Sequence, residues 1–129
     1  MRIDHIAIWV RDLEGMKDFY TKYFQATAGT RYHNPTKQFY SYFLSFPGAS
    51  TRLELMQSPH INKTKGPRGT MQGIAHFAVS VGSKERVDQL TERIRSDHHT
   101  IVGNPRTTGD GYYESVILDP EGNRIEITI

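Results

Sequence analysis

The sequence predicts an α+β fold in which two βαβββ modules form a curved, partly closed mixed sheet. Two observations support this fold: an internal repeat, and a similar order of elements in both copies. The segment HIAIWV at residues 5–10 returns as HFAVSV at residues 76–81, which is 71 positions later. The segment RLEL at residues 52–55 returns as RIEI at residues 124–127, which is 72 positions later. A nearly constant offset at two anchors indicates a duplicated structural unit.

The first module is expected to begin with a strand over residues 2–10, where apolar residues alternate with other types. Asp12 is placed to cap a helix, because its carboxylate can accept hydrogen bonds from the free amides of the first turn. Apolar residues then recur at helical spacing, at Leu13, Met16, Phe19, Tyr20, Tyr23 and Phe24. After Gly29, a short strand and a turn at Asn34 and Pro35 precede two longer strands, over residues 39–46 and 51–56.

The second module repeats this order of elements. A strand is predicted over residues 74–81, and Ser83 can cap a helix whose inner face carries Val87, Leu90 and Ile94. The Asp-Pro-Glu-Gly segment at residues 119–122 is typical of a turn. The remaining strands of the module are predicted over residues 100–102, 112–118 and 123–129.

The length and the repeat together define the expected domain organisation. The chain has 129 residues, enough for one hydrophobic core, and neither module is expected to be stable alone. We therefore expect a single domain of two repeats, at about residues 1–56 and 74–129. The linker over residues 57–73 is basic and contains several Gly and Pro residues. It is interpreted equally well as a solvated connector or as a lid that borders a site.

The composition excludes several classes of function. A net charge of +2 without a basic stripe does not indicate a nucleic-acid partner. The chain has no cysteine, so any metal ion must be held by histidine and carboxylate side chains. No apolar stretch approaches the roughly 20 residues that span a membrane. Because Asp4 and His5 lie in the apolar run near the start, we expect no signal peptide and a cytoplasmic protein.

Alternation along the repeated strands separates an apolar face from a polar face. The apolar face, which carries Ile6, Ile8, Leu53 and Leu55 in the first module, is expected to pack against the helices. The opposite face carries one histidine and one glutamate in each module: His5, Glu54, His76 and Glu126. If the sheet curves around this face, the two pairs meet in a cleft.

Two imidazoles and two carboxylates suit one divalent ion, either Zn, Ni, Mn, Co or Fe. Four protein ligands leave one or two positions open on a five- or six-coordinate ion, and open positions favour a catalytic role. Either residue type alone is typical of an ordinary half-exposed strand position. The recurrence of both types at matched positions on one predicted face favours metal ligation. The histidines that have no counterpart in the other module are interpreted as surface residues: His33, His60, His98 and His99.

Arginines and aromatic residues near the predicted cleft are interpreted more simply. Arg52 and Arg124 lie two residues from the glutamates and are expected to pair with acidic side chains. Packing is the favoured interpretation for three aromatic residues that could also line the cleft: Trp9, Tyr112 and Tyr113.

The whole chain resembles the vicinal oxygen chelate superfamily, which includes glyoxalase I, bleomycin resistance proteins and extradiol dioxygenases. The resemblance rests on DHIAIWV, FYTKYF, RLELM, GIAHFAVSV and, most specifically, GDGYYESVILDPEGNRIEIT. In that family the metal ligands come from the first and last strands of each module, which correspond here to His5, Glu54, His76 and Glu126. This ligand set is most similar to that of bacterial-type glyoxalase I, a lactoylglutathione lyase. No glutathione-binding set is recognisable.

The resemblance implies a metal-dependent glyoxalase-like lyase or isomerase. Its small substrate would chelate the ion through adjacent oxygens, as the hemithioacetal of a 2-oxoaldehyde and a thiol does, and would react through an enediolate. Glu126 is the expected catalytic base, and Glu54 is the alternative. The rival functions are a non-haem Fe(II) dioxygenase on the same fold, and a resistance protein that binds a drug or metabolite without catalysis. We expect a homodimer, whose sites form either within one chain or between two subunits.

Overall fold

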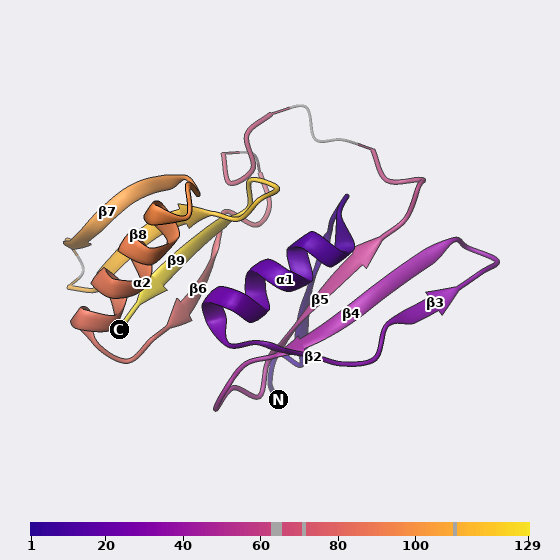
Figure 1. Cartoon of the computed structure of the whole chain (residues 1–129), viewed down its shortest axis with the longest axis horizontal. Helices are drawn as coiled ribbons and strands as arrows, with labels where there is room; N and C mark the ends of the chain where they lie inside the picture. Colours follow the sequence, from indigo (N-terminus) through magenta and orange to yellow (C-terminus); the bar gives the residue numbers. More distant parts are fainter. Residues whose placement is uncertain (63–65, 71, 110) are drawn as a thin grey trace. The chain divides into compact units, whose positions relative to one another are not determined.

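The computed structural model describes residues 1–62, 66–70, 72–109 and 111–129. The chain divides into two compact units, unit 1 over Met1–Lys63 and unit 2 over Thr64–Ile129. Each unit contains one helix on one mixed sheet, which confirms the predicted α+β class with two modules (Figure 1). The strands of the described residues form two separate sheets, and neither sheet is closed.

Unit 1 contains a five-stranded sheet and the helix α1 (Leu13–Phe24). Its strands are β1 (His5–Trp9), β2 (Thr27–Ala28), β3 (Tyr32–Asn34), β4 (Phe39–Ser45) and β5 (Arg52–Gln57). The order across the sheet is β1-β5-β4-β2, and β3 also pairs with β4. Strands β1 and β5 run parallel, whereas the other pairs are antiparallel. The first and last strands of the unit are therefore direct neighbours.

Unit 2 repeats this topology with four strands and the helix α2 (Lys84–Ser96). Its strands are β6 (Phe77–Ser80), β7 (Ile101–Thr107), β8 (Tyr113–Leu118) and β9 (Arg124–Thr128). The order across the sheet is β6-β9-β8-β7, and β6 runs parallel to β9. The first and last strands are again direct neighbours, as the repeat predicts.

Both helices begin at the predicted caps. The amide of Gly15 donates a 3.0 Å hydrogen bond to Oδ1 of Asp12, and the amide of Arg86 donates a 3.3 Å hydrogen bond to Oγ of Ser83. All six apolar positions predicted for the inner face of α1 are buried. They pack on the sheet face that carries Leu53 and Leu55, which forms the core of unit 1. No described helix is long and apolar enough to span a membrane.

The core of unit 2 contains a polar pair that the apolar pattern did not predict. Thr91 and Ser115 are both fully buried, and their hydroxyl oxygens lie 2.6 Å apart. Because the hydroxyl of Thr91 also donates to the carbonyl oxygen of Val87 at 2.7 Å, the hydroxyl of Ser115 must donate to Thr91. Both buried hydroxyl groups are thus satisfied.

Several local predictions differ from the structure. Leu90, predicted for the inner face of α2, is only half-buried, and Thr91 is buried beside Val87 and Ile94. Strand β2 has only two residues, which is too short to produce a periodic pattern. Strand β7 continues to Thr107 and has register shifts against β8, so Pro105 and the irregular pairing conceal it in the sequence. Strand β6 begins at Phe77, so His76 lies immediately before the strand and not within it. Part of the predicted linker, including Lys63 and Lys65, lies outside the described residues.

Candidate metal centre

Each unit places its predicted histidine and glutamate next to each other. In unit 1, Nε2 of His5 lies 3.9 Å from Oε2 of Glu54. The parallel pairing of β1 with β5 sets Ala7 beside Glu54, so a small side chain occupies the position next to the carboxylate. The imidazole can therefore reach along the sheet to the glutamate. The side chain of His5 is 40% exposed and that of Glu54 is 13% exposed.

Unit 2 repeats this arrangement with the second pair. Nε2 of His76 lies 3.2 Å from Oε2 of Glu126. The pairing of β6 with β9 sets Ala78 beside Glu126, which matches the position of Ala7 in unit 1. The side chain of His76 is 43% exposed and that of Glu126 is 20% exposed, so both side chains are partly accessible to solvent.

Within each unit, the two donor atoms lie close enough together to bind one divalent ion. Zinc lies about 2.0–2.1 Å from a ligand nitrogen and about 2.0–2.2 Å from a carboxylate oxygen, so two donors on one ion are at most about 4.3 Å apart. The separations of 3.9 Å in unit 1 and 3.2 Å in unit 2 both lie below this limit. The donor types and their spacing are therefore compatible with two ligands per unit.

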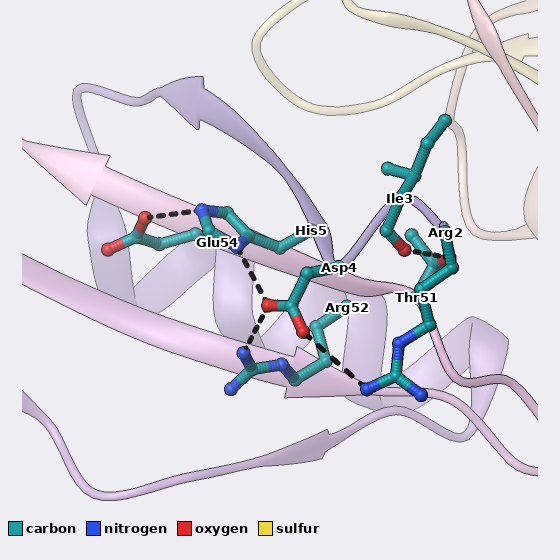
Figure 2. A network of polar contacts seen from close by, with 7 residues as sticks. All are labelled: Arg2, Ile3, Asp4, His5, Thr51, Arg52 and Glu54. Atoms are coloured by element: carbon teal, nitrogen blue, oxygen red, sulfur yellow. Dashed lines mark hydrogen bonds and ion pairs between the residues drawn. The ribbon is translucent and has the colours of Figure 1, made fainter.

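A network around Asp4 orients the imidazole of His5 (Figure 2). Nδ1 of His5 lies 3.1 Å from Oδ2 of Asp4, and Nη2 of Arg52 donates a 2.6 Å hydrogen bond to the same oxygen. These hydrogen bonds to His5 and Arg52, together with the charge of Arg52, lower the pKa of the Asp4 carboxyl. The predicted pairing of Arg52 with an acidic residue is thus confirmed.

The network also determines which nitrogen of a neutral His5 can bind a cation. An ionised Asp4 only accepts hydrogen bonds, so Nδ1 must carry the proton and Nε2 keeps its lone pair. That lone pair and Oε2 of Glu54 are then two acceptors 3.9 Å apart. Around metal ions, a carboxylate commonly binds the histidine nitrogen that does not bind the metal. Asp4 is therefore a supporting residue that the sequence pattern did not single out.

The second pair lacks this support. Ala75 occupies the position before His76, and no described carboxylate binds Nδ1 of His76. Arg124, the counterpart of Arg52, has a buried Nε without a hydrogen-bond partner among the described residues. Taken by itself, each unit brings two of the four predicted ligands together. The described residues contain no group of three or more potential metal ligands, so the four-ligand centre stays a prediction.

The other titratable candidates lie away from these pairs. The ring of His33 stacks on Tyr40, with ring centroids 4.3 Å apart. The hydroxyl of Tyr113 donates a 2.8 Å hydrogen bond to Asp88 of α2, so Tyr113 belongs to the helix-facing side of its sheet. Trp9 packs edge-on against Phe39, with ring centroids 6.0 Å apart, but it is also 38% exposed and lines a pocket.

One family model matches nearly the whole chain. The family model of the Glyoxalase/Bleomycin resistance protein/Dioxygenase superfamily matches residues 2–127. The uncharacterized protein YqjT of Bacillus subtilis (strain 168) is 25% identical over 126 residues, which cover 95% of this chain and 94% of that protein.

Solved structures show the same fold at lower identity. A glyoxylase/bleomycin resistance protein/dioxygenase domain from Frankia sp. EAN1pec has a TM-score of 0.84 and 19% identity, covering 100% of this chain and 97% of that chain. Glyoxalase I of Leishmania major has a TM-score of 0.77 and 24% identity, covering 99% and 86%. Glyoxalase I of Zea mays has a TM-score of 0.78 and 24% identity, covering 98% and 44%.

Proposed function

Because this chain belongs to the Glyoxalase/Bleomycin resistance protein/Dioxygenase superfamily, we propose that it is a divalent-metal-dependent lyase or isomerase. Its small substrate presents two adjacent oxygen atoms, as in the hemithioacetal of a 2-oxoaldehyde and a thiol. The observation that carries the proposal is the matched pair of contacts between a histidine Nε2 and a glutamate Oε2, at 3.9 Å in unit 1 and 3.2 Å in unit 2.

The proposed ligands of the ion are the four residues of these contacts: His5, Glu54, His76 and Glu126. Their nitrogen and oxygen donors suit Zn, Ni, Mn, Co or Fe in the divalent state. When bound, such an ion supplies Lewis-acid polarisation of the substrate oxygens. In this proposal, the two pairs serve the same ion, either within one chain or between two subunits of a homodimer.

The proposed base is Glu126. Its carboxylate takes the proton from a substrate carbon next to a carbonyl group, and the electrons of the broken C–H bond form an enediolate. Glu126 then returns the proton to the neighbouring carbon, which completes the isomerisation without an external oxidant or reductant. Two features of the described residues favour Glu126 over Glu54. Its side chain is the more exposed of the two, at 20% against 13%, and no network like that around Asp4 supports its histidine partner.

An activity assay with metal removal and replacement tests the proposal. Purified protein is incubated with the adducts that methylglyoxal forms with glutathione or with other small thiols, and product is measured with and without a chelator. We expect turnover that the chelator abolishes and that one of the five metal ions restores. If no adduct reacts with any of these ions, the proposed reaction is wrong.

The same samples separate the rival functions. A dioxygenase of this family would consume oxygen with Fe(II) and would fail with Zn or Ni. A binding protein without catalysis would bind its ligand equally well after treatment with a chelator. Either result would replace the proposed lyase or isomerase function.

A further inference from the structure

A pocket of about 610 Å³ lies in unit 1, at the Trp9 end of β1, which is the end farther from His5. Side chains alternate along a strand, so Trp9 lies on the same sheet face as His5, four residues away. A strand rises about 3.3 Å per residue, which places the two Cα atoms about 13 Å apart. The volume is typical of sites for small organic ligands. The pocket and the His5–Glu54 pair therefore share one face of the sheet.

Three aromatic rings form the apolar part of the pocket. The ring of Phe39 contacts both Trp9 and Tyr32, with centroids 6.0 Å apart in each case. The strand registers place Trp9, Met56, Ser41 and Tyr32 in one row across four strands, so the two large rings stand at the two edges of the row. Trp9 and Tyr32 remain 38% and 53% exposed. A flat apolar ligand could cover this exposed aromatic surface.

The polar part of the pocket is positive. Lys37, Asn34 and His60 line it, and none of the described residues that line the pocket is an aspartate or a glutamate. The backbone amide of Lys37 donates a 3.1 Å hydrogen bond to Oδ1 of Asn34, which holds the turn between β3 and β4. This turn carries Lys37, which lines the same pocket as the three aromatic rings. The side-chain amide nitrogen of Asn34 and the imidazole of His60 can also donate hydrogen bonds to an anion.

We propose that this pocket binds a planar aromatic organic anion, with its ring against Trp9, Tyr32 and Phe39 and its negative group at Lys37. We assign this anion to the end of the substrate that is remote from the reacting carbons, and this assignment rests on the proposed function. Binding of the anion itself does not, because none of the lining residues is a proposed metal ligand.

The test uses 2-naphthoate as the probe, with metal-free full-length protein. Trp9 is the only tryptophan of the chain, so its indole N–H gives a single, assigned NMR signal in the pocket. We expect one naphthoate per chain by calorimetry and a saturable shift of the Trp9 signal. Lys37→Gln should weaken binding about three- to tenfold, whereas Lys22→Gln on α1 should leave it unchanged. The neutral analogue 2-naphthalenemethanol and the non-aromatic cyclohexanecarboxylate should both bind more weakly.

The proposal is overturned if about 10 mM 2-naphthoate, a concentration that would detect even weak affinity, leaves the Trp9 signal unchanged. It is also overturned if the two lysine variants bind equally well, or if cyclohexanecarboxylate binds as tightly as naphthoate. Tyr32→Ala provides a second variant on the aromatic side and should also weaken binding. Naphthoate binding without any uptake of metal would contradict the proposed function and support the proposed ligand of the pocket. Metal uptake without naphthoate binding would do the reverse.

Discussion

The two units hold equivalent histidine–glutamate pairs, but among the described residues only the histidine of unit 1 has a carboxylate at its second ring nitrogen. Asp4 accepts from both His5 and Arg52, and the ring of Phe43 meets the ring of His5 edge-on at 5.2 Å. In unit 2, Ala75 replaces Asp4, and the register that places Phe43 beside Glu54 places Val116 beside Glu126. The duplication has therefore kept the proposed ligands and changed their surroundings. This difference predicts that the histidine–glutamate pair of unit 1 holds a fixed orientation and that the pair of unit 2 is more adaptable.

The largest effect should follow from removing the proposed base in the adaptable pair. Glu126→Gln keeps an oxygen that can bind a metal ion but cannot accept the proton, so we expect turnover to fall at least about 100-fold with metal still bound. Glu54→Gln should cost less turnover. The control is Glu92→Gln, which changes an exposed glutamate on α2 that pairs with Arg95. Normal turnover by Glu126→Gln, or a larger loss in Glu54→Gln, would reverse the assignment of the base.

The next effect concerns the support of His5. Asp4→Asn removes the carboxylate that holds Nδ1 of His5. We expect metal affinity to fall about 10- to 100-fold, as it does in other proteins when the hydrogen-bond partner of a ligating histidine is lost. Asp18→Asn on α1 is the matched control, because Asp18 pairs only with the nearby Lys17 in the described ion pairs. Affinity is measured by calorimetric titration with Zn or Ni. Equal affinities for the two variants would show that Asp4 does not orient a ligand.

The cores of the two units offer a comparison of stability. Thr91 lies 71 positions after Tyr20, so a polar residue in unit 2 occupies the place of an aromatic residue in unit 1. Thr91→Val deprives the buried hydroxyl of Ser115 of its partner, and we expect the free energy of unfolding to fall by about 1–3 kcal/mol. Thr91→Ser keeps the hydroxyl, so we expect the free energy of unfolding to fall by less in this variant. Urea unfolding measures both variants, and equal losses would indicate a packing effect instead.

The smallest effect should be a dependence on pH that comes from Asp4. Its hydrogen bonds to His5 and Arg52 lower its pKa below the ordinary value of 3.8. A lowered pKa in the folded state stabilises the fold above the ordinary pKa, and this contribution is lost as the pH falls through the lowered value. The stability difference between the wild type and Asp4→Asn should therefore shrink as the pH falls below about 4, where Asp4 takes up its proton. A difference that grows as the pH falls through this range would contradict this sign.

Much of the fold could be predicted because the repeated sequence segments coincide with strands. The recurrence of His, Arg and Glu at fixed offsets located β1, β5 and β9, and the helical spacing located α1. What the sequence could not indicate depends on contacts that occur only once. Asp4 has no counterpart before His76, so the repeat did not single it out. The pocket likewise depends on contacts between distant segments: the pairing of β3 with β4 brings Tyr32 to Phe39, and the order β1-β5-β4 of the sheet brings Phe39 to Trp9.

The stoichiometry of bound metal tests most directly the central claim that the two pairs serve one ion. Metal-free protein is loaded with excess Ni or Zn, desalted, and analysed for metal per chain, alongside His5→Ala and His76→Ala. We predict one ion per chain in the wild type and a large loss in both variants, because each removes a ligand of the same ion. Two ions per chain, with each variant losing only one, would show that the pairs act separately. The absence of bound metal in the wild type would contradict the account altogether.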